Sequence, residues 1–248
     1  MKRAYWEQMA PAYDEEIFDL LKNDSRSLVR AEIKKFASKK KTAIDIGCAI
    51  GKWLPVLAPQ FQKVVALDIS ARNLEIARER HPQFSNIEYR RADMSATTTR
   101  LPACDFGICI NAILTPDQQD RDRFFRALRS CIRKGGHLII TVPSLESWLL
   151  THIVQQKWKI DASLFPSASA RTAKKKWHNI LQGNADIDAV PHKHYLREEL
   201  ALLLAREKME ACSFQKIEYE WRTEFHQPPR WLKEPRPWDW MVTAKRMG

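Results

Sequence analysis

The residues best suited to chemistry follow four short apolar runs in the first half of the chain. Gly47 and Gly51 follow the first run, and small residues at such a turn let a ligand approach the backbone closely. Asp68 ends the second run, where a carboxylate can accept both hydroxyl hydrogens of a ribose. Asp93 follows the third run and Asn111 the fourth. Because ligands of doubly wound sheets bind beyond the carboxyl ends of the strands, these groups are expected to converge on one crevice.

The elements that must position these groups alternate along the chain. Apolar runs at residues 42–47, 63–70, 87–91, 105–110 and 137–142 predict strands, and helical spacing predicts helices at 52–58, 71–80 and 118–133. This alternation indicates a parallel sheet with helices on both faces. After residue 143 the regular alternation of predicted strands and helices ends. A helix at 196–209 and two strands at 214–221 and 238–245 complete the expected order.

The chain of 248 residues is expected to form one domain with two additions. Residues 1–41 show helical spacing and predict an amino-terminal helical cap. Residues 42–143 and 195–248 form the predicted core. Between them, residues 144–194 contain three tryptophans and two prolines but no clear strand. We interpret this stretch as an insertion after the fifth strand that serves as a substrate lid.

Composition excludes several classes of protein. With 44% hydrophobic and 29% charged residues the chain is globular, and no apolar stretch is long enough to span a bilayer. The five cysteines include no C-x-x-C pair, which argues against a disulfide framework and against a metal site, and favours reduced thiols in the cytoplasm. The net charge of +11 is spread thinly, with clusters only at residues 39–41 and 174–176. This distribution argues against nucleic acid as the first choice of partner.

The order of these residues resembles that of the class I S-adenosylmethionine-dependent methyltransferases of small molecules. The resemblance is clear over residues 5–143 and loose over 192–246. It rests on Asp-x-Gly-x-x-x-Gly at 45–51, acidic residues at 68 and 93, and the segments DFGICIN and LRSCIRKGGHLIITVPS. It implies an α/β, Rossmann-like fold of three layers, α/β/α. The sheet would have seven mostly parallel strands, with an antiparallel strand at 238–245.

The same resemblance implies a cofactor, S-adenosylmethionine, which leaves as S-adenosylhomocysteine, and it implies the residues around it. Glycines and their neighbours would border the methionine part, Asp68 would hold the ribose, and the segment after the third strand would contact the adenine. Aromatic side chains of the cap would close over the cofactor. The residues implied are Tyr5, Trp6, Tyr13, Asp45, Gly47, Cys48, Ala49, Gly51, Asp68, Ile69, Asp93, Met94 and Asn111.

Ala49 departs from the family pattern, which usually has glycine at this position. An alanine fits the loop provided that its φ angle is negative, and on that basis we expect cofactor binding to be retained. A bulkier or differently turned loop would instead weaken cofactor binding or abolish activity.

Methyl transfer needs a general base only if the acceptor must lose a proton. His192, His194 and Tyr195 are the candidates, since they join the insertion to the next helix, near the expected acceptor pocket. The two histidines alternate, so at most one is expected to face the pocket. The alternative is that all three are surface or helix-entry residues.

We therefore predict methylation of a small-molecule acceptor, with three alternatives left open. An RNA or protein methyltransferase would use residues 174–176 and Trp177 to grip a polyanion. Against it, residues 111–114 are Asn-Ala-Ile-Leu, which lacks the two prolines and the aromatic residue of the family's amine-methylating signature. A non-catalytic protein that binds S-adenosylmethionine is favoured by Ala49. The alternation alone would also suit a nicotinamide dehydrogenase. The acceptor, the methylated atom and the oligomeric state stay open.

Overall fold

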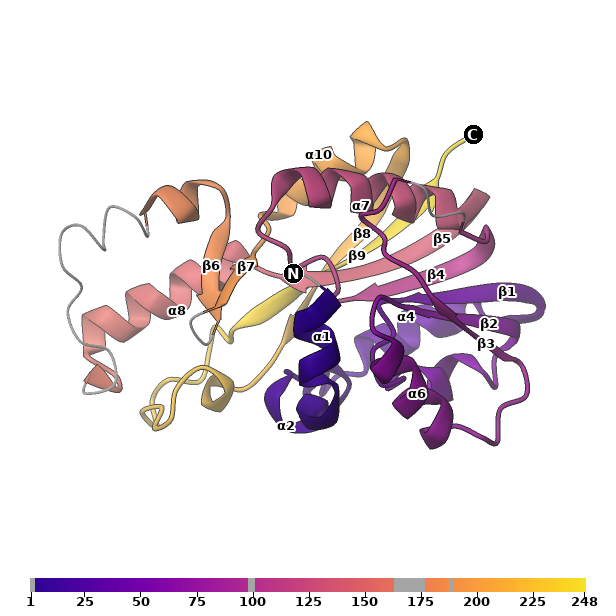
Figure 1. Ribbon diagram of the computed structural model, residues 1–248. Helices are drawn as coiled ribbons and strands as arrows, with labels where there is room; N and C mark the ends of the chain where they lie inside the picture. Colours follow the sequence, from indigo (N-terminus) through magenta and orange to yellow (C-terminus); the bar gives the residue numbers. More distant parts are fainter. Residues whose placement is uncertain (1–2, 98–100, 163–176, 188–189) are drawn as a thin grey trace.

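A computed structural model describes residues 3–97, 101–162, 177–187 and 190–248. Its larger sheet has the strand order β3-β2-β1-β4-β5-β9-β8 (Figure 1). The strands of this sheet are β1 (Ser38–Ile46), β2 (Phe61–Asp68), β3 (Ile87–Arg91), β4 (Cys104–Ile110), β5 (Ile132–Pro143), β8 (Met209–Glu218) and β9 (Trp238–Arg246).

Strands β1 to β5 pair in parallel, and β9 runs antiparallel to both β5 and β8. The predicted fold class is therefore confirmed, including the antiparallel strand near residues 238–245. In this topology the carboxyl ends of β1, β2, β3 and β4 lie at one edge of the sheet, as the convergence of the site residues requires.

Helices cover both faces of the sheet (Figure 1). Alternate strand residues enter two separate clusters: Ile44 and Val65 pack with α7 and α10, while Ala43 and Val64 pack with α4 and α6. Strands buried on both faces in this way account for the continuous apolar runs in the sequence. The helices are α4 (Leu28–Phe36), α5 (Leu54–Leu57), α6 (Ala71–Arg80), α7 (Gln118–Cys131) and α10 (Arg197–Arg206).

Several expected boundaries differ from the structure, among them the end of one helix and the starts of three strands: β1, β5, which begins at Ile132 and not at 137, and β8. The helix expected to reach residue 209 ends at Arg206, because Lys208 adopts a left-handed φ of 54° and turns the chain back toward the sheet. Met209 then begins β8, opposite Arg246 of β9. The first strand begins at Ser38, four residues before the expected start, although only its second half is fully buried.

The amino-terminal cap consists of several short helices. They are α1 (Arg3–Met9), a 3₁₀ turn (Ala10–Ala12), α2 (Tyr13–Glu16) and α3 (Leu20–Asn23), followed by α4. Pro11 interrupts the first stretch, and Ser27 with a φ of 52° separates α4 from what precedes it. The short helices let the chain follow the edge of the site closely.

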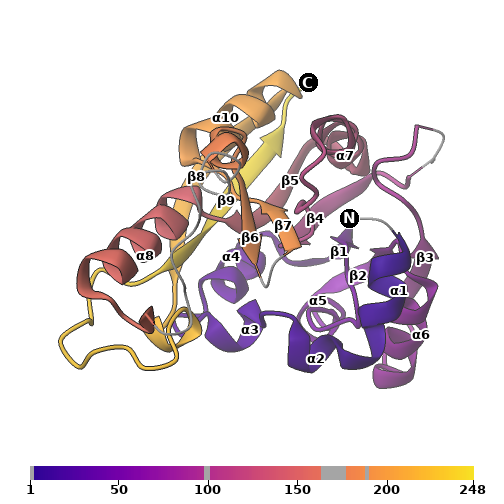
Figure 2. The same cartoon turned by 60° about the vertical axis from the view of Figure 1, so that its left-hand side comes forward.

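The segment 144–194 begins with α8 (Leu145–Trp158) and ends with a hairpin of β6 (Asn184–Ile187) and β7 (Val190–Lys193). Since no clear strand was expected here, the hairpin is a correction. It is anchored by Lys193, whose buried ammonium donates to Glu199 at 2.6 Å and to the carbonyl of Gln182 at 3.1 Å. In both views the hairpin lies between α8 and α1 (Figure 2).

Candidate functional site

The loop between β1 and α5 brings bare backbone to the edge of the sheet. Gly47 has a φ of 73°, and a Cβ there would lie 2.5 Å from the Cβ of Ala112. Gly51 has a φ of 81° and would meet Leu54 at 2.8 Å. Both positions therefore require glycine on two grounds, conformation and space. The loop presents a narrow backbone surface that a ligand can approach.

Ala49 adopts a φ of 46°, so the expectation of a negative angle is wrong. This left-handed conformation is strained for a residue with a Cβ. Its backbone N–H donates to Oδ2 of Asp68 at 2.9 Å, which holds the loop against the end of β2. The chain thus keeps the loop shape that a glycine would adopt freely, and the carboxylate helps to hold it there.

Asp68 is 6% exposed and is held by three donors. Besides Ala49, the backbone N–H of Ser70 donates to Oδ1 at 2.8 Å and the amide of Asn73 donates to the same atom at 3.3 Å. Burial raises the pKa of Asp68, and the hydrogen bonds from Ser70 and Ala49 oppose that rise. The carboxylate lines the cavity and keeps lone pairs for ligand hydroxyls.

Asp93 follows β3, and its Oδ1 accepts from the backbone N–H of Ser95 at 2.8 Å and from its hydroxyl at 2.6 Å. Met94 beside it is buried. The pair combines a fixed carboxylate with an apolar surface, a combination that suits an adenine ring bearing an amino group.

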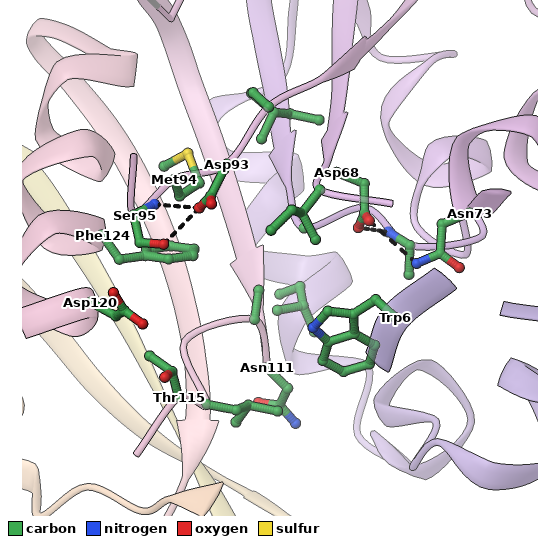
Figure 3. Close-up of a pocket in the computed structure, with 18 of the residues that line it drawn as sticks. Trp6, Asp68, Asn73, Asp93, Met94, Ser95, Asn111, Thr115, Asp120 and Phe124 are labelled. Atoms are coloured by element: carbon green, nitrogen blue, oxygen red, sulfur yellow. Dashed lines mark hydrogen bonds between the residues drawn. The ribbon is translucent and has the colours of Figure 1, made fainter. Parts of the chain in front are cut away.

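These elements surround one cavity. Figure 3 shows Asp68 with Asn73 on one side, and Asp93, Met94 and Ser95 on the other. Trp6 lies near Asn111 at a third side of the same space. The lining residues are Trp6, Tyr13, Gly47, Ala49, Leu67, Asp68, Ile69, Asn73, Ala92, Asp93, Met94, Ser95, Ile110, Asn111, Ala112, Leu114, Thr115, Asp120 and Phe124.

Asn111 is held in one orientation by a network behind the cavity. Its amide donates to Oδ2 of Asp239 at 2.8 Å, and its Oδ1 accepts from Thr141 at 3.0 Å. Asp239 is buried and also accepts from Tyr219 at 3.3 Å. Burial raises the pKa of Asp239 to about 6 and that of Glu224 to about 7, with Asp239 adding to the rise at Glu224. The amide nitrogen carries two hydrogens, so one remains after the bond to Asp239.

Asp45 lies beneath the glycine loop, 1% exposed, and its Oδ2 has no hydrogen-bond partner among the described residues. Burial, with the neighbouring Asp68 as the second cause, raises the pKa of Asp45 to about 8. An orphaned buried carboxyl beside the cavity is matched by a cationic ligand group, such as an α-amino group.

The structure places nine of the predicted cofactor residues along the cavity: Trp6, Tyr13, Gly47, Ala49, Asp68, Ile69, Asp93, Met94 and Asn111. The remaining four lie around it. Tyr5 packs edge-on against Trp6 with ring centroids 5.1 Å apart. Asp45 in β1 and Cys48 in the loop are buried, and the carbonyl of Gly51 accepts from His81 at 2.9 Å. Cofactor contact by all thirteen stays a prediction.

His192, His194 and Tyr195 do not line this cavity. All three are buried; the phenol of Tyr195 donates to the carbonyl of Ile113 at 3.0 Å, and the His194 ring contacts the carbonyl of His192 at 3.1 Å. Burial lowers the pKa of His194 to about 4, so its ring is neutral at neutral pH. Through its bond to Ile113, Tyr195 supports the loop after β4. The catalytic role of the three residues stays a prediction.

Several lining residues were missed by the sequence analysis. Ala112, Leu114 and Thr115 follow Asn111 directly, so their place after a strand end was a usable signal. Asp120 and Phe124 come from α7, and Asn73 from α6, where nothing in the local pattern distinguishes them from ordinary helix residues. Residues 174–176, which the RNA alternative invokes, lie outside the described residues.

Two further features of the described part of the chain bear on function. It contains no group of three or more His, Cys, Asp or Glu side chains placed to hold a metal ion. No helix in it is long and apolar enough to cross a membrane.

Comparison with known proteins agrees with this geometry. A family model described as a methyltransferase domain matches residues 43–136. No curated protein sequence matches the chain.

Among solved structures, the PH0226 protein from Pyrococcus horikoshii has a TM-score of 0.64 at 16% identity, covering 99% of this chain and 100% of its own. An S-adenosylmethionine-dependent methyltransferase from Mesorhizobium loti gives 0.63 at 18% identity, covering 92% of this chain and 100% of its own. The N-methyltransferase NodS from Bradyrhizobium japonicum, in complex with S-adenosylhomocysteine, gives 0.62 at 13% identity, covering 98% and 97%. These likenesses concern the fold.

The described residues fit S-adenosylmethionine as the cofactor. Asp68 offers acceptors for the ribose, Met94 and Ile69 offer apolar surface, and the orphaned carboxyl of Asp45 matches the cofactor's amino group. Gly47 leaves space where a side chain would intrude. Residues 43–136 match the methyltransferase-domain model, and the chain has the Rossmann-like fold of class I S-adenosylmethionine-dependent methyltransferases, with a cavity that fits this cofactor.

Proposed function

We propose that this methyltransferase transfers the methyl group of S-adenosylmethionine to a small molecule held between the amino-terminal helices and the loop after β4. The observation that carries the proposal is that side chains of the amino-terminal helices cover the cavity. Trp6 and Tyr13 from the cap line the same space as Asn111 and Thr115 from the far side. A compact acceptor can be enclosed there, whereas a large polymer would need the cover to open.

The bound cofactor supplies a methyl group on a cationic sulfur, which a nucleophile can displace in line. The tasks left to the chain are to orient the acceptor and to exclude water. The ring of Trp6, 6.4 Å from that of Tyr13, covers the cavity from the cap. Asn111 presents an amide hydrogen whose direction is set by Asp239 and Thr141. An acceptor with an oxygen or nitrogen lone pair can be oriented by that donor.

If the acceptor must lose a proton, the proposed base is His192, His194 or Tyr195, acting from behind the loop after β4. The backbone supports this placement, since the N–H of Lys193 donates to the carbonyl of Leu114 at 2.9 Å. The neutral ring of His194 is a proton acceptor at neutral pH. Tyr195 is the least available of the three as a base, because burial raises its pKa well above the usual value and keeps its phenol protonated at neutral pH.

The proposal is tested by letting the protein label a cell extract from S-adenosylmethionine that carries a radioactive methyl group. We expect label to accumulate in the low-molecular-mass fraction. The Asp68→Ala variant serves as the matched control for background labelling. Label in RNA or protein would move the assignment to the polymer-methylating alternative. Heat on binding of S-adenosylhomocysteine, without label in any fraction, would favour a non-catalytic binding protein.

A further inference from the structure

Glu7 of α1 joins the amino-terminal cap to the core through three hydrogen bonds. Its Oε1 accepts from the backbone N–H of Ala71 at 3.0 Å. Its Oε2 accepts from the hydroxyl of Ser70 at 3.0 Å and from the backbone N–H of Arg72 at 3.1 Å. One carboxylate therefore engages two backbone donors and one hydroxyl at the start of α6.

These donors are the ones that a helix leaves unsatisfied at its first turn. The ten-residue helix α6 begins at Ala71, and its amino terminus carries partial positive charge. Ser70 caps the helix locally by accepting from the N–H of Asn73 at 3.1 Å. Glu7 supplies a second, charged cap from a helix more than sixty positions away in the chain. The contact thus pairs a carboxylate with the favourable end of the helix dipole.

Within the described part of the chain, few other contacts hold α1 in place. None of its residues is buried, so no apolar core anchors the helix. The following segment is secured by ion pairs of Asp14 with Lys52 at 3.0 Å and Arg80 at 2.8 Å. Glu7 is the corresponding attachment for α1 itself, and it lies directly beside Trp6, which covers the cavity.

The contact also reaches the cofactor side of the site. Ser70, whose hydroxyl donates to Glu7, donates its backbone N–H to Oδ1 of Asp68 at 2.8 Å. Asp68 in turn accepts from Ala49 of the glycine loop. Cap, helix start, ribose carboxylate and loop therefore form one continuous hydrogen-bonded chain.

We propose that Glu7 is a positioning residue: its carboxylate, docked on the amino terminus of α6, holds Trp6 over the bound cofactor, so that release of the cofactor requires this contact to break. The proposal rests on the cofactor and not on the class of acceptor. The lowered pKa of Glu7 agrees with it, since the backbone and hydroxyl donors together outweigh the opposing effect of desolvation.

The test compares Glu7→Gln with Glu15→Gln, using S-adenosylhomocysteine as the probe. Glu15 is an exposed acid on the adjoining α2, so its substitution makes the same change in charge away from α6. Calorimetry should show an affinity about tenfold weaker for Glu7→Gln, a typical effect of losing a charge-assisted hydrogen-bond pair. Stopped-flow measurement should place this loss mainly in faster dissociation. Glu15→Gln should match the wild type.

Two readouts separate positioning from a role in overall stability. Amide hydrogen exchange over residues 3–9 should slow when S-adenosylhomocysteine binds the wild type, and should slow much less in Glu7→Gln. In a double-mutant cycle, Trp6→Ala should weaken binding in the wild type and have a clearly smaller effect in the Glu7→Gln background. Glu7→Asp, which keeps the charge on a shorter side chain, should recover part of the affinity.

Several results would overturn the proposal. Additive effects of the two substitutions would show that Glu7 does not act through Trp6. Equal affinities for Glu7→Gln and the wild type, at a temperature where both are folded, would show a stabilising role only. If Glu7→Gln fails to fold, the same comparison is made with Glu7→Asp, and unchanged dissociation there counts against the proposal. Absence of binding by the wild type would instead refute the cofactor site itself.

Discussion

At the scale of single residues, the acids around the cavity have distinct environments and therefore distinct tasks. Asp68 has three donors and is fixed at the end of β2. Asp45, near the end of β1, has an oxygen with no partner among the described residues. Burial raises the pKa of both acids, but at Asp68 the hydrogen bonds from Ser70, Ala49 and Asn73 oppose that rise, whereas at Asp45 burial and the nearby Asp68 raise it to about 8.

Replacing Asp68 tests the assignment of the ribose carboxylate. In Asp68→Ala both ribose hydroxyls lose their charged partner, and we expect cofactor binding to weaken by about 1.5–3 kcal/mol. Calorimetric titration with S-adenosylhomocysteine measures the effect. The control is Asp68→Asn, which keeps the shape but not the charge and should bind with intermediate affinity. Unchanged binding in the alanine variant would mean that the ribose lies elsewhere.

At the scale of elements, the loop between β1 and α5 carries strain at Ala49. A left-handed alanine is less stable than glycine by about 1–2 kcal/mol in the folded state. Glycine loses part of this advantage, about 0.4–1 kcal/mol, through the greater freedom of the unfolded chain. We therefore predict that Ala49→Gly raises the free energy of unfolding by about 0.5 kcal/mol or slightly more. Urea denaturation measures it.

Ala58→Gly is a suitable comparison for that measurement. Ala58 is buried just after α5 with a right-handed φ of −56°, so glycine there should only destabilise. If Ala49→Gly also destabilised the protein, the left-handed conformation of Ala49 would be refuted.

The elements that the sequence predicted are those whose own residues show a recognisable pattern. Buried parallel strands such as β2 and β4 appear as continuous apolar runs, and the residues at their ends are found at the edge of the sheet. The hairpin of β6 and β7 was missed because its residues show no alternating pattern, and its anchor is a buried lysine. The contact of Glu7 with α6 was equally invisible, since it pairs distant segments whose residue types are ordinary on any helix surface.

At the scale of the whole molecule, the buried acid beneath the loop makes stability depend on pH. The pKa of Asp45 is raised to about 8 in the folded protein from 3.8. The unfolded chain therefore ionises first, and the stability of the ligand-free protein should fall as the pH rises between these values. Asp239 and Glu224, with pKa values of about 6 and about 7, act in the same direction.

Substituting Asp45 by asparagine isolates its share of this dependence. We predict that the free energy of unfolding of Asp45→Asn, relative to the wild type, increases between pH 5 and pH 8 by an amount on the order of a few kcal/mol. Urea denaturation at both pH values measures it, with Glu15→Gln as the control that keeps the wild-type dependence. A constant difference between Asp45→Asn and the wild type would contradict the raised pKa.

The strand order has a consequence for how the site is completed during synthesis. The strands that lead to Gly47, Asp68, Asp93 and Asn111 are all made before residue 112, but β9 inserts between β5 and β8 and is made last. Asp239, the partner of Asn111, is synthesised 128 residues after it. A nascent chain on the ribosome can therefore bring Gly47, Asp68 and Asp93 together early, while the orientation of Asn111 is fixed only after residues 238–246 have emerged.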